Sequence, residues 1–317
     1  MAGTIAPGLL DLARAGDARA LARLISLVEN SSPQVRPVIR DLLPSTGRAR
    51  IIGLTGAPGV GKSTMTGALV GALRAAGRRV GVLAIDPSSP FTGGALLGDR
   101  IRMQDHATDD QVFIRSMANR GHLGGLAAAT PQAIRVLDAA GFDPVVIETV
   151  GVGQDEVEIA SMADSVVVLL APGMGDAIQA AKAGILEIAD LFAVNKADKP
   201  DVHPVVRDLR NMIALGNWHQ GDWKPPIITT VAVNGPRDEG IAELVSRLDA
   251  HWSWLGSSGE LQRRRHARAR EEITVLAFAA LHGRLRTSGI DELAARVADG
   301  TLDPFQAAEE VLAQQED

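Results

Sequence analysis

The sequence predicts an α/β fold in which a mostly parallel sheet carries helices on both faces. Apolar runs of strand length recur along the chain, at 50–55, 79–85, 111–116, 144–149, 165–171, 190–195 and 226–232. Segments of helical character lie between most of these runs, at 62–76, 130–140, 176–188 and 238–250. This alternation is typical of parallel sheets, because parallel strands need long crossover connections. A chain of 317 residues with 46% apolar content can also fill a large core.

Three parts of the chain are expected from this pattern. The strand-rich core should occupy 48–255, preceded by an amino-terminal helical extension at 1–47. A carboxy-terminal arm at 256–317 should begin with a long helix and continue into one or two more. The basic run "RRRHARAR" at 263–270 falls in that long helix, and we expect it to form a solvated face rather than a site for an acidic partner.

Composition excludes several classes of function. A net charge of -6 gives no electrostatic basis for binding nucleic acid, which needs clustered positive charge. The absence of cysteine removes disulfides, thiolate nucleophiles and cysteine-ligated metals, and it fits a cytoplasmic location. No apolar segment is long enough to span a membrane. The histidines have no zinc-like spacing, which argues against a metallochaperone.

The strongest motif is "GAPGVGKST" at 56–64, a phosphate-binding P-loop placed between a predicted strand and a predicted helix. Its glycines allow backbone N–H groups to face a β-phosphate at the helix amino terminus. Lys62 is expected to bridge β- and γ-phosphates, and the Ser63 hydroxyl to bind Mg²⁺. The nucleotide-binding residues predicted here are Gly56, Ala57, Pro58, Gly59, Val60, Gly61, Lys62, Ser63 and Thr64.

A second motif, "NKAD" at 195–198, predicts that the base is guanine. The Asp198 carboxylate can accept hydrogen bonds from both adjacent donors of guanine, a pair that adenine lacks. Asn195 should tie this loop to the P-loop, and the Lys196 stem should pack over the base. A last base-contacting loop is expected at Val231, Ala232 and Val233, where a serine common in GTPases is replaced by valine.

The stretch "IETVGVGQ" at 147–154 predicts a switch between these two motifs. Glu148 and Gly151 keep the D-x-x-G spacing of GTPases with a longer acid, so Glu148 should reach Mg²⁺ directly or through a water, and Gly151 should face the γ-phosphate. Asp86 and Asp99, on a glycine- and serine-rich loop, are further candidates for the Mg²⁺ site. Val152 stands where Ras-like enzymes place a water-orienting glutamine, so help with hydrolysis is expected from elsewhere.

Taken in order, these motifs together with "APGMGDAIQAAKAGILEIAD" resemble the MeaB/ArgK family of GTPases over nearly the whole chain. The resemblance implies a SIMIBI-class P-loop fold and a homodimer formed through the carboxy-terminal arm. It implies a G-protein chaperone that gates cofactor loading of an adenosylcobalamin-dependent methylmalonyl-CoA mutase and protects or reactivates it, with a cobalamin adenosyltransferase as a further partner. It also implies that Gln179 and Lys182 assist hydrolysis, and one helix face can carry both.

Two readings outside this class remain open from the sequence. The chain could be a P-loop kinase, in keeping with the transport-kinase name of ArgK, or a nucleotide-dependent binding module with negligible catalysis. A metallochaperone GTPase is a further alternative.

Overall fold

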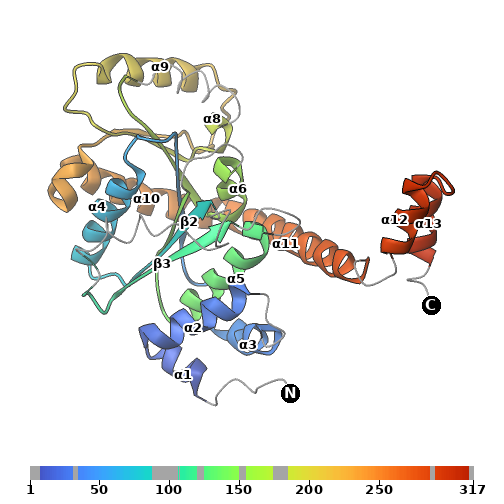
Figure 1. The fold of residues 1–317 in the computed structure, drawn as a ribbon. Helices are drawn as coiled ribbons and strands as arrows, with labels where there is room; N and C mark the ends of the chain where they lie inside the picture. The colour runs from blue at the N-terminus through green and yellow to red at the C-terminus, as the bar shows by residue number, and fades with distance from the viewer. Residues whose placement is uncertain are drawn as a thin grey trace.

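The computed structural model describes residues 8–30, 35–87, 106, 108–119, 125–149, 155–173, 185–285 and 290–313. Its centre is a seven-stranded sheet with the strand order β3-β2-β4-β1-β5-β6-β7, in which every pairing is parallel. The strands are β1 (Ile51–Thr55), β2 (Val80–Pro87), β3 (Val112–Asn119), β4 (Val145–Thr149), β5 (Ser165–Leu170), β6 (Leu191–Val194) and β7 (Ile227–Thr229). The predicted parallel sheet is therefore confirmed, and each apolar run supplies one strand (Figure 1).

Helices cover both faces of this sheet, as the alternation predicted. One face packs against α4 (Lys62–Ala75) and α10 (Glu239–Ser258). The other packs against α5 (Gly125–Ala139), α6 (Asp155–Met162), α8 (Ile185–Ile188) and α9 (Val202–Ala214). Strands buried on both faces read as continuous apolar runs, which explains why the strands were visible in the sequence.

The strand order creates a switch point between β1 and β4. The chain leaves β1 toward β2 on one side of the sheet and leaves β4 toward β5 on the other. In open α/β sheets, ligands bind outside the carboxyl ends of the strands at such a point. The P-loop follows β1 and Glu148 lies near the end of β4, so the P-loop and the switch motif lie at this point of the sheet.

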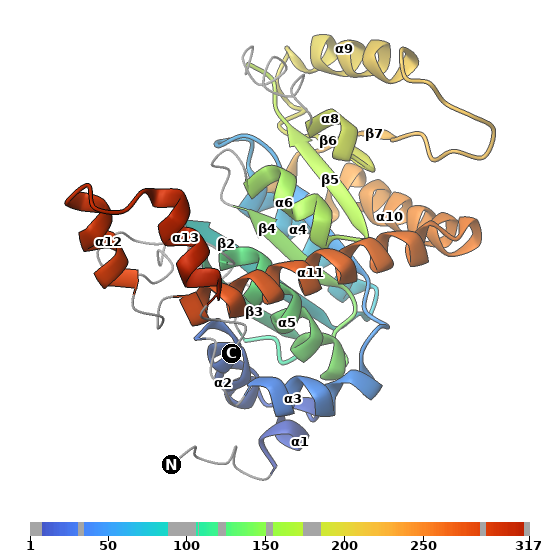
Figure 2. The same ribbon diagram turned by 90° about the vertical axis from the view of Figure 1, so that its right-hand side faces the viewer.

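The amino-terminal helices extend the core beyond the sheet. Helices α1 (Leu9–Arg14), α2 (Ala18–Glu29) and α3 (Val35–Leu42) pack with α5 in one apolar cluster (Figure 2), and the short 3₁₀ helix η1 (Leu43–Ser45) follows α3. Asp17 caps α2 by accepting a hydrogen bond from the Ala20 backbone N–H at 2.7 Å. Glu29 at the end of α2 forms an ion pair with Arg115 of β3 at 2.6 Å.

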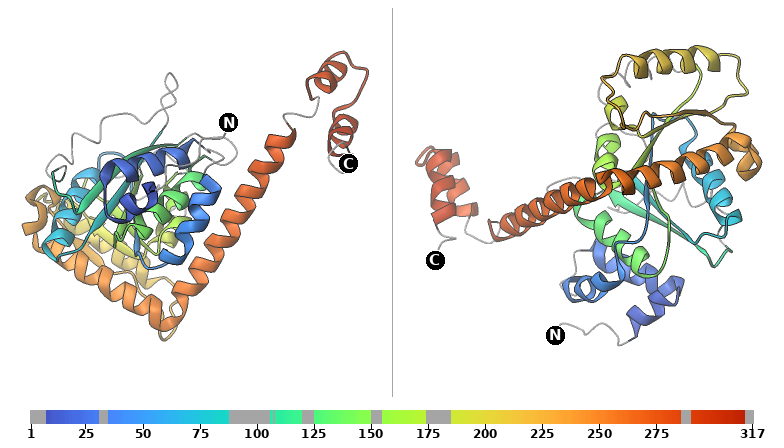
Figure 3. Two further views of the ribbon diagram at one scale, coloured as in Figure 1. Left: turned by 90° about the horizontal axis from the view of Figure 1, so that it is seen from below. Right: turned by 180° about the vertical axis from the view of Figure 1, so that it is seen from behind.

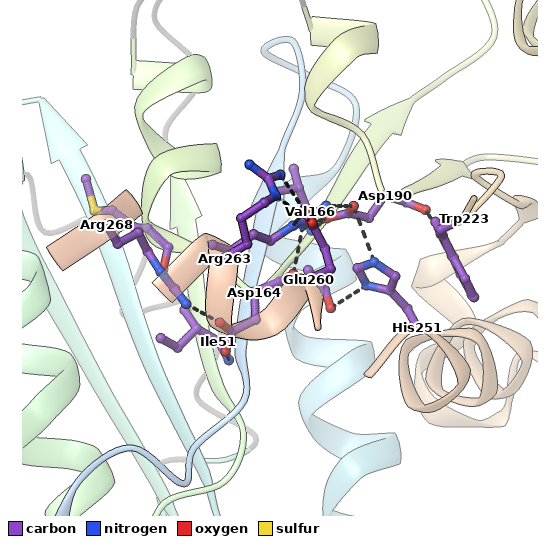
Figure 4. Close-up of polar contacts among 12 residues, drawn as sticks. Ile51, Asp164, Val166, Asp190, Trp223, His251, Glu260, Arg263 and Arg268 are labelled. Carbon is purple, nitrogen blue, oxygen red and sulfur yellow. Dashed lines mark hydrogen bonds and ion pairs between the residues drawn. The ribbon is translucent and has the colours of Figure 1, made fainter. Parts of the chain in front are cut away.

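The long helix α11 (Glu260–Leu285) crosses the amino ends of the central strands, and three arginines of its basic run turn toward the protein. Arg264 forms two hydrogen bonds of 2.8 Å with Asp190, while Arg265 and Arg268 both contact Asp164. The two aspartates are buried and stand immediately before β6 and β5 (Figure 4). The expectation for the basic run is therefore wrong for these three arginines, because the spacing 264, 265 and 268 directs them onto one helix face, which points at buried acids, whereas Arg263, His266 and Arg270 are exposed as expected. We call Asp164, Asp190, Arg264, Arg265 and Arg268 the arm clamp.

A buried histidine lies beside the arm clamp where α10 gives way to α11. His251 has no exposed surface, its Nδ1 lies 2.8 Å from the Ser165 hydroxyl, and its Nε2 lies 3.4 Å from Asp190. The rings of Trp223 and Trp254 pack against the imidazole. Burial lowers the pKa of His251 to about 4, so the imidazole is neutral in the folded protein near pH 7.

Beyond the clamp, α11 leaves the body of the molecule (Figure 3). The apolar side chains Ile273, Leu276, Phe278 and Leu281 of this part are exposed. Helices α12 (Ile290–Ala298) and α13 (Pro304–Ala313) follow and share a small core of their own. None of the helices in the described ranges has the length and apolarity needed to cross a bilayer.

Candidate functional site

The P-loop forms a tight turn between β1 and α4, as its sequence predicts. Gly56 has a φ of 146°, and a Cβ at this position would lie 2.3 Å from the Leu169 carbonyl oxygen. Gly61 has a φ of 95° and directly precedes α4, and a Cβ there would lie 2.6 Å from Asn195 Nδ2. Both positions require glycine because a side chain would meet these neighbours and strain the backbone. The loop therefore leads directly into the amino terminus of α4, a position whose free backbone N–H groups are suited to binding an anion.

Lys62 opens α4 and folds back over the loop. Its ammonium group donates hydrogen bonds to the carbonyl oxygens of Gly56 at 2.5 Å and Ala57 at 3.2 Å. The side chain is buried, with a relative exposure of 8%. The cation is thus held inside the phosphate loop, where it can bind phosphate oxygens without crossing to another element.

Ser63 and Glu148 meet across α4 and β4. The Ser63 hydroxyl donates to Glu148 Oε1 at 2.7 Å, and both residues are buried. Thr66, one turn further along α4, donates to Glu148 Oε2 at 2.8 Å and has no exposed surface. A carboxylate, a hydroxyl and nearby phosphate oxygens are hard ligands of the kind that Mg²⁺ prefers, so these residues fit a magnesium site.

Asn195 connects three loops of the site through its side-chain amide. Nδ2 donates to the Val60 carbonyl oxygen of the P-loop at 2.9 Å. Oδ1 accepts from the Ala232 backbone N–H at 3.0 Å and from the Thr230 hydroxyl at 3.3 Å. The predicted link between the "NKAD" loop and the P-loop is present, and it extends to the last predicted loop as well.

The remaining charged residues of the "NKAD" loop, Lys196 and Asp198, lie nearer the surface than Asn195. Lys196 adopts a left-handed backbone with a φ of 58°, and its ammonium donates to the Gly59 carbonyl oxygen at 2.7 Å. The lysine stem thus spans from one loop to the other, with the exposed Asp198 two residues later. In the last loop Ala232 is buried, whereas Val233 is 79% exposed.

Several predicted residues lie outside what the structure describes. Asp99, Gly151, Gln179 and Lys182 fall in the gaps between the described ranges. For Asp86 only the backbone is described, at the carboxyl end of β2 beside β4. The roles predicted for these five residues remain predictions.

Sequence reasoning missed two residues that the structure places in the site. Thr66 and Thr230 both donate hydrogen bonds to predicted site residues. The position of Thr66 could have been found, because it lies three residues after Ser63 and therefore on the same helix face. Thr230 offered no comparable signal, since its contact depends on how β7 ends.

Comparison with known proteins shows that the chain is similar to a family of GTPases over most of its length. Residues 21–289 match the family described as "Methylmalonyl Co-A mutase-associated GTPase MeaB". A protein of Pyrococcus abyssi named as a GTPase is 48% identical over 310 residues, covering 96% of this chain and 95% of the relative. The mitochondrial methylmalonic aciduria type A homolog of Caenorhabditis elegans is 35% identical, covering 79% of this chain and 66% of the relative.

Among solved structures, that of a LAO/AO transport system kinase superposes with a TM-score of 0.69. It is 26% identical and covers 99% of this chain and 100% of its own. The predicted P-loop fold is confirmed by this similarity over the full length.

Proposed function

Since this chain belongs to the MeaB family and is a GTPase, we propose that its GTP hydrolysis regulates an adenosylcobalamin-dependent methylmalonyl-CoA mutase. The protein would act as a chaperone that gates cofactor loading and protects or reactivates the mutase, with a cobalamin adenosyltransferase as a further partner in the cytoplasm. The observation that carries the nucleotide part is the Asn195 network, which connects the phosphate loop, the base loop and the loop after β7. The mutase part is supported by the family description and by the name of the Caenorhabditis elegans relative.

The chemistry proposed for the site is phosphoryl transfer to water. Lys62 would hold β- and γ-phosphate oxygens, and Asp198 would accept both donors of the guanine edge. Mg²⁺ would offset charge on the phosphates, held by Ser63 with Glu148, Asp86 and Asp99 near it. Gly151 would contact the γ-phosphate, and Gln179 and Lys182 would assist hydrolysis, since Val152 cannot orient a water.

The proposed division of the chain assigns dimerisation to the arm. Residues 1–47 would form the helical extension, 48–255 the GTPase domain and 256–317 the dimerisation arm. The exposed apolar side chains of α11 support this assignment, because large apolar residues exposed together on a projecting helix are usually covered by a partner. Two copies of the arm would bury these side chains.

Co-purification tests the mutase proposal. The protein is bound to GDP or to a nonhydrolysable GTP analogue and mixed with adenosylcobalamin-dependent methylmalonyl-CoA mutase, and complex formation is measured by size-exclusion chromatography. We expect the complex to depend on which nucleotide is bound. Absence of a complex in both nucleotide states would contradict the chaperone role while leaving the GTPase assignment intact.

A kinase is the second candidate, favoured by the name of the transport system kinase whose structure superposes on this chain. The two activities differ in the fate of the γ-phosphate. A GTPase releases inorganic phosphate from GTP with no other substrate present, whereas a kinase needs an acceptor. We expect phosphate release from GTP alone, and the release should be lost in Lys62→Ala.

A further inference from the structure

The hydrogen bonds of Glu148 point to a function for Thr66 that the motif does not include. Each carboxylate oxygen of Glu148 accepts from a different hydroxyl of α4, Oε1 from Ser63 at 2.7 Å and Oε2 from Thr66 at 2.8 Å. All three side chains are buried, and Thr66 has no exposed surface. Hydrogen bonds between neutral donors and a buried carboxylate are short and strong, so the pair of hydroxyls fixes the plane of the carboxylate.

The geometry follows from where the three residues lie. Ser63 and Thr66 are three residues apart on a helix, so their side chains share one face. Glu148 pairs with Leu54 of β1 and Ala84 of β2, which places it in the middle of the sheet beneath α4. The extra methylene of glutamate, compared with aspartate, lets the carboxylate reach between the two hydroxyls.

The Thr66 hydroxyl has a second acceptor within its own helix. It lies 3.1 Å from the Lys62 carbonyl oxygen, the usual partner of a threonine in the middle of a helix. The contact with Glu148 is shorter and involves a charged acceptor, so it is the stronger of the two. The Thr66 hydroxyl therefore donates mainly to Glu148 in the site and less to the Lys62 carbonyl oxygen of its own helix.

A serine hydroxyl that binds a cation presents a lone pair to it, so its proton must point to another acceptor. Glu148 Oε1 is such an acceptor at 2.7 Å, and its position depends on what holds the other oxygen. We propose that Thr66 is a positioning residue, which fixes Glu148 so that Glu148 orients the Ser63 hydroxyl toward Mg²⁺. This inference rests on the proposed Mg²⁺ site, and it gives Glu148 an indirect part in binding the metal.

The alternative is that Thr66 only fastens α4 to the sheet. Loss of the hydroxyl would then weaken the fold or nucleotide binding to the same degree with and without Mg²⁺. A positioning function instead changes the Mg²⁺ dependence alone. The two can be separated by measuring how Mg²⁺ slows the release of GDP.

The experiment measures release of a fluorescent GDP analogue from the full-length protein, from EDTA to millimolar Mg²⁺. For Thr66→Val we expect the Mg²⁺ concentration for half-maximal slowing to rise about tenfold or more, the usual loss when a group that orients a metal ligand is removed. The rate in EDTA should stay within about twofold of wild type, because no metal is then bound. Thr66→Ser keeps the hydroxyl and should behave as wild type.

Thr130→Val is the matched control. Thr130 is a buried threonine of α5 whose hydroxyl has no hydrogen-bond partner among the described residues, so its loss should leave the Mg²⁺ midpoint unchanged. Thermal melting checks that each variant is folded, and Thr66→Ala carries the same expectation as Thr66→Val should the latter not fold.

An unchanged midpoint in a folded Thr66→Val or Thr66→Ala overturns the inference, as does an equal rise in release rate with and without Mg²⁺. In both cases wild-type release still responds to Mg²⁺ and the proposed metal site stands. A wild-type protein whose GDP release ignores Mg²⁺ overturns the metal site and the inference together.

Discussion

Both ends of the central strands carry buried acids, but the acids have different kinds of partner. At the carboxyl end, Glu148 accepts hydrogen bonds from the hydroxyls of Ser63 and Thr66. At the amino end, Asp164 and Asp190 accept from arginines of α11. Asp164 also accepts from the Ile51 backbone N–H at 3.0 Å, and Asp190 from the Val166 N–H at 2.8 Å.

This difference separates a binding site from a structural joint. A hydroxyl is neutral and rotates, so it can bind a metal as well as donate to the acid. A guanidinium is permanently charged and forms paired hydrogen bonds, so it neutralises the acid and holds one geometry. The carboxyl ends of the strands are therefore suited to a ligand that binds and dissociates. The amino ends are suited to a permanent attachment of the arm.

The largest effect should come from breaking the arm clamp. Asp164→Ala leaves Arg265 and Arg268 partly buried without their carboxylate, and we expect it to lower the free energy of unfolding by about 3–5 kcal/mol. Urea unfolding of the nucleotide-free protein measures this. The control is Asp249→Ala, which removes a more exposed carboxylate paired with Arg50 and Arg78, and it should cost about 1 kcal/mol or less. Equal losses in the two variants would remove the distinction between clamp and surface pair.

A change at the carboxyl ends of the strands should affect the chemical step. Lys62→Ala should slow single-turnover GTP hydrolysis by about 100- to 1,000-fold, because a charge directed at the transferring phosphate is lost. A hydrolysis rate within tenfold of wild type would contradict the proposed function of Lys62.

The two ends also differ in how well the sequence predicted them. The site at the carboxyl ends of the strands is built from local motifs. A phosphate loop and a base loop each need particular residues at fixed spacing, so both can be found in the sequence. The turn at Gly56 and the link from Asn195 to the P-loop were predicted for this reason. The contact between Thr66 and Glu148 was not, because it joins residues 82 positions apart through the packing of α4 on β4.

The amino end could not be predicted in the same way. Asp164 and Asp190 are single acids before apolar strands, and nothing in their neighbourhood indicates an arginine partner. The basic run resembles a solvated helix face until the direction of α11 is known, because only the packing decides which face is covered. Contacts of Arg268 with Asp164 span 104 positions, and local patterns carry no information about them.

A substitution in the base loop provides a second test of the site at the carboxyl ends of the strands. Asp198→Asn should weaken GDP binding by about 100-fold, because two charge-assisted hydrogen bonds to guanine are lost. Binding of a xanthine nucleotide should improve, since its carbonyl can accept from the introduced amide. Fluorescence titration with both nucleotides measures the change. A variant that binds GDP as tightly as wild type would show that Asp198 does not recognise the base.

The amino ends of the strands should respond to pH through His251. Burial lowers the pKa of His251 to about 4 in the folded protein, whereas an unfolded histidine titrates near 6.5. Between these values the unfolded chain binds the proton and the folded chain does not, so the free energy of unfolding falls as the pH drops from about 6.5 to about 4. Above that window the contribution of this residue is constant, and a shift of this size corresponds to roughly 3 kcal/mol.

His251→Asn isolates that contribution from those of the carboxylates. Asparagine can still bond Ser165 but does not titrate, so the variant should lack the part of the acid sensitivity that belongs to His251. We expect the difference in unfolding free energy between wild type and variant to fall by roughly 3 kcal/mol from pH 7 to pH 4, measured by urea unfolding at fixed salt. Parallel stability curves would mean that His251 has the same pKa in the folded and the unfolded protein. Burial between α10 and α11 would then not disfavour the protonated imidazole.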